Sequence, residues 1–191
     1  KETIRGKSNA EGKYKKQTGG HGQYGHCKMR FEPTEKDFEF AEEIVGGTVP
    51  KQYIPAVEKG ITECLSRGVL AGYPVIRIKA TLYDGSYHDV DSSEAAFKAA
   101  AELAFREGMK NASPVLLEPI SRLRIAVPEQ YLGDVLGDLN KRRGRILGMD
   151  AQDEMQIVTA EAPKAEILTY ATSLRSMTQG RRRFTETFSL Y

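Results

Sequence analysis

Residues 19–31 read Gly-Gly-His-Gly-Gln-Tyr-Gly-His-Cys-Lys-Met-Arg-Phe, and this stretch decides between two folds. Its spacing Gly20-x-Gly22-x-x-Gly25 matches the fingerprint of a dinucleotide-binding turn. Such a turn needs a buried strand before it and a helix after it, because the helix N-terminus holds the pyrophosphate. Here residues 12–18 are polar, and residues 26–32 alternate between polar and apolar side chains. The alternation predicts a strand with one solvated face, so we expect the loop to join two antiparallel strands.

A basic segment surrounds this loop. Residues 1–30 contain eight Lys and Arg against two acidic residues, whereas the whole chain has a formal net charge of only +2. Glycines let a backbone approach another molecule closely, and the cations favour a polyanion as that molecule. The segment therefore predicts contact with nucleic acid, with a purely structural hairpin as the alternative. A kinase-type glycine hairpin has the same form, but no catalytic-loop or metal-binding signature follows it.

The bulk properties are those of an ordinary globular protein of one or two domains. The chain has 191 residues, of which 40% are hydrophobic and 28% charged. No apolar run approaches the roughly 18 residues of a membrane span, and no secretory signal is present, so we expect a cytoplasmic protein. Cys27 and Cys64 fall on apolar faces of a strand and a helix, which favours reduced thiols and leaves a disulfide open. The first residue is Lys1, not Met, which indicates an excised fragment, and we expect a monomer.

The first part of the chain alternates strands with helices. The expected elements are a basic hairpin over about 10–33, a strand at 38–40, a helix from Pro50 to near Gly68, a strand from Ile76 to Gly85, and a helix after Asp91. The run Asp91-Ser92-Ser93-Glu94 predicts Asp91 as the N-cap of the last helix, with Glu94 completing a capping box. The many alanines of that helix predict close packing against a sheet.

The pattern restarts after residues 111–114, Asn-Ala-Ser-Pro. The expected elements are a strand around 123–127, a helix around 132–139, strands at 145–149 and 155–162, a helix over about 164–175 and a strand at 184–190. A turn is expected at 150–154. This β-α-β-β-α-β order is the ferredoxin-like split motif. The sequence therefore predicts an α+β protein of two domains, residues 1–115 and 116–191.

A second loop, residues 83–91, holds Ser86, His88 and two aspartates within a few positions. Triad members usually meet from separate parts of a fold, and these are strung along one turn, so hydrolase chemistry is disfavoured. A metal site from His88, Asp89 and Asp91 is equally weak, because no further His or Cys has ligand spacing to it. We therefore expect no catalytic residue and no metal.

Two arginine clusters occur in the second half. Residues 141–145, Lys-Arg-Arg-Gly-Arg, close a predicted helix, where cations suit the helix dipole and Gly144 is the expected left-handed cap. Residues 181–183 begin a strand and suit a solvated edge. A structural role is favoured for each cluster, with a phosphate contact as the alternative.

Eight runs of sequence occur together in this order: Gln17–Gly25, Val45–Pro50, Tyr53–Gly60, Leu82–Ser93, Gly133–Asn140, Arg142–Ile146, Tyr170–Thr172 and Leu174–Gly180. Through them the chain resembles, over essentially its whole length, domains IV and V of bacterial elongation factor G. That family of translational GTPases drives translocation on the ribosome. The resemblance implies a first domain with a left-handed β-α-β crossover, as in a small-subunit ribosomal protein, and a ferredoxin-like second domain.

The resemblance also implies a site. Two loops at the tip of the first domain would enter the decoding centre of the ribosome, against A-site tRNA and mRNA. They carry Gly19, Gly20, His21, Gly22, Gln23, Tyr24 and Gly25, and Ser86, Tyr87, His88 and Asp89. His88 matches the histidine that becomes diphthamide in the eukaryotic and archaeal factor, and bacterial factors leave it unmodified, so we expect no modification. Candidate contacts to rRNA or tRNA phosphates are Lys15, Lys16, Lys28, Arg142, Arg143 and Arg145.

Three departures from the family pattern limit what this chain does. His21 stands where Arg is common, and the chain ends at Tyr191, where the family usually continues into a C-terminal helix. No Gly-x-x-x-x-Gly-Lys-Ser/Thr motif occurs, so the chain itself is not expected to be an enzyme. GTP and Mg²⁺ would belong to an N-terminal domain of the parent, and this part would need no cofactor. A paralogue acting in ribosome recycling or protection is the alternative, followed by a nucleotide-binding enzyme using the glycine-rich loop.

Overall fold

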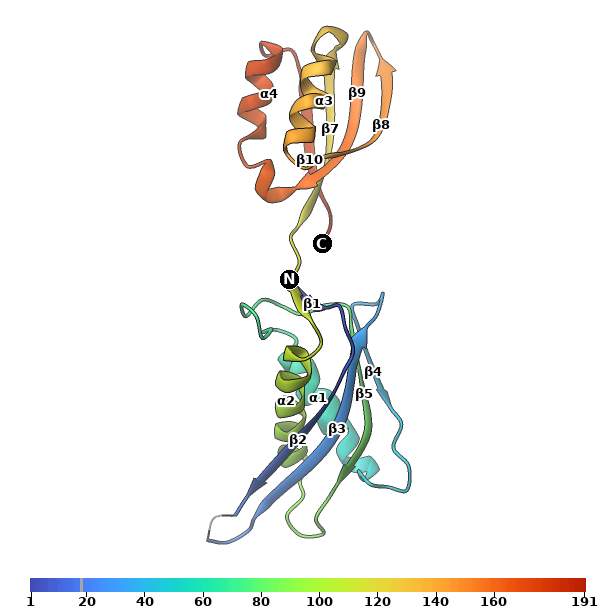
Figure 1. Cartoon of the computed structure of the whole chain (residues 1–191), viewed down its shortest axis with the longest axis vertical. Helices are drawn as coiled ribbons and strands as arrows, with labels where there is room; N and C mark the ends of the chain where they lie inside the picture. The colour runs from blue at the N-terminus through green and yellow to red at the C-terminus, as the bar shows by residue number, and fades with distance from the viewer. Residues whose placement is uncertain (18) are drawn as a thin grey trace. The chain divides into compact units, whose positions relative to one another are not determined.

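The computed structural model describes residues 1–17 and 19–191. Thr18, which belongs to the run Gln17–Gly25, lies outside the described residues. The chain divides into two compact units, Lys1–Leu117 and Glu118–Tyr191 (Figure 1).

A four-stranded mixed sheet forms the first unit. Its strands, in spatial order, are β2 (Ser8–Lys16), β3 (Gln23–Pro33), β5 (Ile78–Ser86) and β4 (Phe38–Glu42). β3 is antiparallel to both β2 and β5, which confirms that the glycine-rich loop joins two antiparallel strands. β4 is parallel to β5, and helix α1 (Ile54–Cys64) connects the two. The resulting β-α-β crossover agrees with the predicted fold class.

Helices α1 and α2 (Glu94–Lys110) cover one face of this sheet (Figure 1). α2 lies very close to β2 and β3. A Cβ atom on Gly12 would collide with the carbonyl oxygen of Ala100, and one on Gly25 with that of Ala96. Glycine on the strands and alanine on the helix thus allow backbone-to-backbone contact. The predicted close packing of the alanine-rich helix is confirmed.

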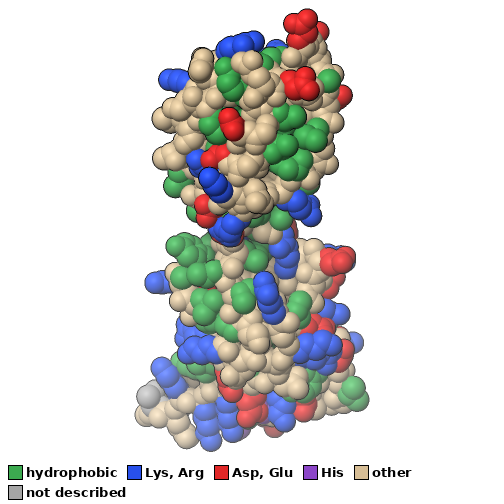
Figure 2. Space-filling model, turned by 45° about the horizontal axis from the view of Figure 1, so that its top comes forward, with side chains coloured by type: hydrophobic (Ala, Val, Ile, Leu, Met, Phe, Trp, Pro, Cys, Tyr) green, Lys and Arg blue, Asp and Glu red, His purple; other side chains and the backbone are tan. Residues whose placement is uncertain are grey.

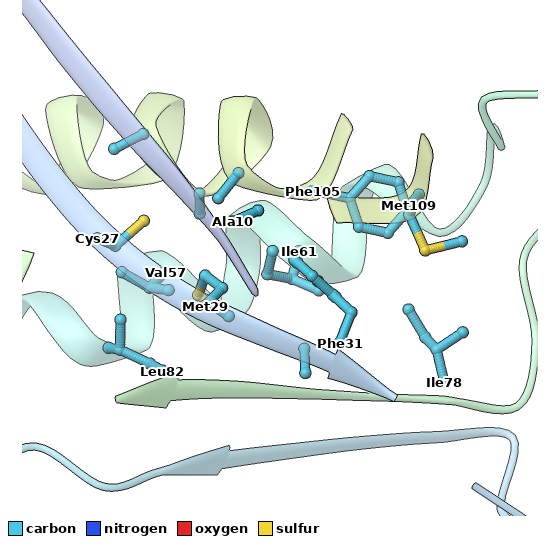
Figure 3. Close-up of a cluster of buried hydrophobic side chains, with 14 of the residues drawn as sticks. Ala10, Cys27, Met29, Phe31, Val57, Ile61, Ile78, Leu82, Phe105 and Met109 are labelled. Carbon is cyan, nitrogen blue, oxygen red and sulfur yellow. The ribbon is translucent and has the colours of Figure 1, made fainter. Parts of the chain in front are cut away.

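The core between sheet and helices is apolar and fully buried. Phe31 of β3 meets Phe105 of α2 edge to face, with 5.9 Å between ring centroids, and Met29, Ile61 and Leu82 belong to the same buried cluster (Figure 3). Burying each such side chain contributes roughly 1.5–3 kcal/mol. Cys27 belongs to this core and Cys64 is half-buried; both thiols are free, and burial raises the pKa of Cys27 to about 12.

One irregularity interrupts the pairing of β3 with β5. Met29 lies opposite Leu82, but Lys28 lies opposite Asp84, so Tyr83 is an extra residue on β5. This is a β-bulge, in which two residues of one strand oppose one residue of its neighbour.

A two-stranded sheet of β1 (Glu2–Ile4) and β6 (Pro114–Leu116) completes the first unit. The Glu2 side chain is buried, and its carboxylate accepts hydrogen bonds from the backbone N–H groups of Leu70 (2.9 Å), Ala71 (3.0 Å) and Tyr73 (2.8 Å). The sequence did not reveal these strands, because three residues are too few to show a period.

The second unit is a four-stranded antiparallel sheet with two helices on one face (Figure 1). The spatial order is β10 (Arg183–Leu190), β7 (Ile120–Pro128), β9 (Met155–Pro163) and β8 (Arg145–Gln152). Helix α3 (Leu132–Lys141) follows β7 and helix α4 (Tyr170–Thr178) follows β9. The predicted ferredoxin-like order is confirmed.

Several predicted boundaries were wrong by a few residues. α1 ends at Cys64, well before Gly68, because the N–H of Leu65 bonds to Thr62 and closes a tight final turn. β8 continues through Gln152, since Asp150 pairs with Ile157 and only two residues are left for the turn. Residues 164–166 form a 3₁₀ turn, and α4 begins only at Tyr170.

Candidate functional site

Strand pairing brings the two predicted loops to one end of the first unit. We define the first loop as residues 17–22, between β2 and β3, and the second loop as residues 87–92, between β5 and α2. The pairs Lys16 with Gln23 and His26 with Ser86 place both loops at the same edge of the sheet (Figure 1). We call this end of the unit the tip.

Tyr24 fastens the second loop to β3. Its N–H donates to the carbonyl oxygen of Asp91 at 2.9 Å, and its own carbonyl oxygen accepts from Ser92 Oγ at 2.9 Å. Its phenolic oxygen lies 2.6 Å from Ser86 Oγ. Two hydrogen bonds therefore join the second loop to β3, and a third joins β3 to the end of β5, from which that loop begins.

A chain of polar groups crosses the outer face of the sheet below the loops. His26 Nε2 lies 2.9 Å from Glu11 Oε2, and His26 Nδ1 lies 2.7 Å from Ser86 Oγ. Because a carboxylate only accepts, the neutral ring donates through Nε2 to Glu11 and accepts from Ser86 through Nδ1. Tyr24 then donates to Ser86. The hydrogen bond from His26 holds the pKa of Glu11 below its usual value.

The hydrogen-bonded groups Glu11, His26 and Ser86 follow the carboxylate–imidazole–hydroxyl order of a catalytic triad. They are not the Ser86, His88 and aspartate side chains that the sequence suggested. Ser86 bonds to His26, not to His88. Its hydroxyl is shared between His26 and Tyr24, so it serves to join strands β3 and β5. Sequence reasoning missed Glu11 and His26, although Tyr24 and His26 are two positions apart on one strand and so share a face.

His88 lies on the second loop with a side chain that is 53% exposed. Its Nδ1 accepts from the backbone N–H groups of Val90 (3.1 Å) and Asp91 (3.0 Å). The His88 N–H donates to Ser92 Oγ at 2.9 Å, and the Ser92 N–H donates to the His88 carbonyl oxygen at 3.2 Å. The imidazole is thus exposed and also closes the loop on which it lies.

The remaining tip residues differ in exposure. Gly19, Gly20, His21, Gln23, Tyr87 and Asp89 are exposed, Gly22 is half-buried, and Gly25 lies buried within β3. A Cβ atom on Gly22 would lie 2.7 Å from Asp91 Oδ2 and 3.2 Å from the Lys16 carbonyl oxygen. A side chain at this position would therefore crowd the Asp91 carboxylate where the two loops meet.

The predicted cap of α2 was wrong. The N-cap is Ser93, whose Oγ accepts from the Ala96 N–H at 3.1 Å. Asp91 lies two residues earlier, where its carbonyl oxygen is bonded to Tyr24. The helix begins later because Ser92 is held in the second loop by His88 and Tyr24.

The cations near the tip are not equivalent. Lys15 and Lys16 are exposed, and with Gln17, Gln23, Tyr24, His88 and Asp91 they line a hollow of about 180 Å³. Lys28 instead lies between two carboxylates, opposite Glu11 on β2 and Asp84 on β5. Figure 2 shows Lys and Arg side chains interspersed with acidic ones over this part of the first unit. Among the described residues, neither Lys15 nor Lys16 forms an ion pair, so these two are the cations best placed to meet a phosphate.

The arginines of the second unit are mostly engaged within it. All three guanidinium nitrogens of Arg142 donate internally, to Asp138 (2.8 Å), the Glu166 carbonyl oxygen (2.8 Å) and Ser173 (3.0 Å), and the group lies 5.0 Å from the Tyr170 ring centroid. Arg142 therefore fastens α3 to α4.

Arg143 pairs with Glu118 and Glu166, and Arg145, which is 75% exposed, lies 3.5 Å from Glu161. The left-handed residue at the end of α3 is Arg143 (φ 57°), not Gly144 as predicted. A Cβ atom on Gly144 would lie 2.6 Å from the Leu139 carbonyl oxygen, so glycine serves close approach at that position.

The described residues contain no cluster of three or more His, Cys, Asp or Glu side chains arranged to hold a metal ion. No helix in the described part of the chain is long and apolar enough to cross a membrane. The first loop leads into a strand and not into a helix, so it lacks the helix N-terminus that a dinucleotide-binding turn uses.

Comparison with known proteins extends this picture. The family model described as "Elongation factor G, domain IV" matches residues 1–113, and that described as "Elongation factor G C-terminus" matches residues 115–191. Neither description names a GTPase domain. A crystal structure of a protein from Thermus thermophilus is similar at 51% identity, with a TM-score of 0.89. The alignment covers 99% of this chain and 28% of that protein. The chain belongs to the elongation factor G family, of which it comprises domain IV and the C-terminal domain.

Proposed function

We propose that this chain is the ribosome-contacting C-terminal part of an elongation factor G that promotes GTP-dependent translocation of tRNA and mRNA in the cytoplasm. In this proposal both loops of the tip enter the A site of the decoding centre. GTP and Mg²⁺ are bound by an N-terminal domain of the parent protein, and this chain requires no cofactor of its own.

One observation carries the proposal. Tyr24, on the strand that follows the first loop, binds Asp91 and Ser92 of the second loop, so that both loops lie at the same end of a single sheet. Lys15 and Lys16, which form no ion pair with the described residues, lie beside the exposed His88 around one hollow. An RNA duplex with its phosphate backbone is a partner of matching shape and charge.

A salt titration tests the electrostatic part of this proposal. In a full-length factor carrying this chain, Lys15→Ala with Lys16→Ala should weaken ribosome binding and reduce its salt slope by about 1.5, since each phosphate contact contributes roughly 0.7 to 0.9. The matched control is Lys7→Ala with Lys110→Ala, which removes the same charge from exposed positions away from the tip. Equal slopes for both double variants would contradict the placement of the tip against RNA.

A translocation assay tests the assigned step. His88→Ala should slow translocation at least severalfold, with GTP hydrolysis unchanged because the GTPase domain lies elsewhere in the parent. A variant that translocates normally but fails in ribosome recycling would favour the paralogue function instead.

A further inference from the structure

The two ring nitrogens of His88 have different surroundings, and this difference defines what the residue can offer a partner. Nδ1 accepts two backbone N–H groups, from Val90 and Asp91, at 3.1 and 3.0 Å. A ring nitrogen that accepts hydrogen bonds carries a lone pair and no proton. In the neutral imidazole the single ring proton is then on Nε2.

Asp91 Oδ2 lies 3.7 Å from the same Nδ1 atom. An ion pair there would require a proton on Nδ1, in the space that the two N–H groups already occupy. Those two contacts are shorter and directed at the ring nitrogen, so they determine the tautomer.

The loop also fixes where Nε2 lies. Four hydrogen bonds join His88 to Val90, Asp91 and Ser92, and Ser92 and Asp91 are in turn bonded to Tyr24 on β3. Within the described part of the chain no group accepts a hydrogen bond from Nε2, and the side chain is half exposed. Lys15 and Lys16 lie around the adjoining hollow. The ring therefore presents one fixed, unused N–H donor beside two cations.

We propose that His88 divides its two nitrogens between two tasks: Nδ1 closes the second loop, and Nε2–H donates a hydrogen bond to an acceptor oxygen of the RNA sugar–phosphate backbone. This inference rests on the proposed function and specifies the atom through which the tip makes its contact. The Nε2–H group and the ammonium groups of Lys15 and Lys16 are all hydrogen-bond donors, so together they suit an acceptor such as a phosphate or ribose oxygen.

The tautomer is tested first, on the chain itself. The ¹⁵N shifts of the His88 ring in the neutral form should show a protonated Nε2 and an unprotonated Nδ1. The opposite tautomer, or an equal mixture, would overturn the division of tasks whatever the ribosome assays give.

Two amide substitutions then separate the tasks. In His88→Asn the side-chain carbonyl oxygen takes the place of Nδ1, while nothing reaches the place of Nε2. In His88→Gln the amide nitrogen reaches the place of Nε2, while the acceptor near the backbone is lost.

We expect His88→Asn to keep slow hydrogen exchange at the Val90 and Asp91 amides but to translocate as slowly as His88→Ala. His88→Gln should exchange these amides about tenfold faster and yet regain about fivefold in translocation rate over His88→Ala, the effect of one hydrogen bond. The reverse ranking in translocation would overturn the inference.

His21 provides the matched control. It is exposed on the first loop, and no hydrogen bond or ion pair joins its ring to another described residue. His21→Asn and His21→Gln should therefore affect translocation equally. If His88→Ala itself translocates normally, the proposed function of the tip fails, and with it the RNA contact of Nε2; the ring shifts still decide the tautomer independently.

Discussion

Glu2 and His88 perform the same task at two places in the first unit with opposite degrees of burial. Each is a single side chain that accepts several backbone N–H groups of a loop. Glu2 accepts three and is 1% exposed, whereas His88 accepts two and its side chain is 53% exposed. The Glu2 side chain is enclosed by the protein, whereas the His88 side chain is open to water.

Glu2 and His88 differ in whether their hydrogen bonds bear on the stability of the unit or on the shape of its surface. A buried N–H that loses its acceptor costs the desolvation of that group, about 1–3 kcal/mol, whereas an exposed N–H is rehydrated at little cost. Glu2 therefore contributes to the stability of the unit. His88 contributes to the geometry that a partner meets, and the loop there is free to change without unfolding the sheet.

The largest expected effect is at Glu2. Glu2→Ala should lower the unfolding free energy of the first unit by about 3 kcal/mol, because three backbone N–H groups lose a buried acceptor and each hydrogen bond contributes about 1 kcal/mol net. Urea denaturation followed by NMR signals of the first unit measures this change. The exposed Glu35→Ala is the control and should stay within about 0.5 kcal/mol of the parent chain. Equal effects of the two substitutions would break the comparison.

Acid should erase the contribution of Glu2. Burial raises the pKa of this carboxyl, but the three backbone N–H groups outweigh burial and hold the pKa below its usual value of 4.5. A depressed pKa means that the stabilisation is present above 4.5 and is lost as the pH falls through the folded-state value. The difference in unfolding free energy between the parent chain and Glu2→Gln should thus shrink below about pH 4.5. A constant difference down to about pH 2 would show that the carboxylate charge does not matter.

Ser93 is an intermediate case, half-buried and accepting one N–H, from Ala96. Ser93→Ala should cost about 1 kcal/mol, the usual effect of removing a helix N-cap, and Ser93→Asp should restore most of it. Thermal unfolding of the first unit compares the two. A loss from Ser93→Ala that Ser93→Asp does not restore would argue against the capping role.

The smallest effect on stability is expected at His88. His88→Ala should change the unfolding free energy of the first unit by less than about 0.5 kcal/mol, because its two N–H partners become hydrated. The same urea measurement applies. A loss comparable to that at Glu2 would mean that the second loop belongs to the folded core, and the distinction drawn between the two positions would fail.

Elements with many repeats of one period were predictable from the sequence. The hairpin of β2 and β3 and the ferredoxin-like order of the second unit follow from alternation and helical spacing over long segments. The N-cap was not predictable, because Asp91 and Ser93 are both good capping residues and only the contacts of Ser92 with His88 and Tyr24 decide between them.

The side-chain contacts that hold the first unit together could not be predicted from the sequence, because they join residues far apart in the chain. Glu2 meets a loop nearly seventy residues away, and Ser86 meets His26 sixty residues away. No local pattern encodes such a pairing. The two loops could be singled out by composition and by resemblance, but the chain Glu11–His26–Ser86–Tyr24 depends on the register of β3 against β5, which only the structure gives.

That register depends on the bulge at Tyr83. Below the bulge Met29 opposes Leu82, and above it His26 opposes Ser86. If Tyr83 were paired with Lys28 and the lower pairing continued without the bulge, Ser86 would lie opposite Gly25, and its side chain would turn to the core face of the sheet. The bulge therefore sets the register in which β5 enters the second loop. Deleting Tyr83 should leave Ser86 opposite His26, whereas deleting one residue between the bulge and Ser86 would bring Ser86 opposite Cys27 and damage the tip more than most substitutions.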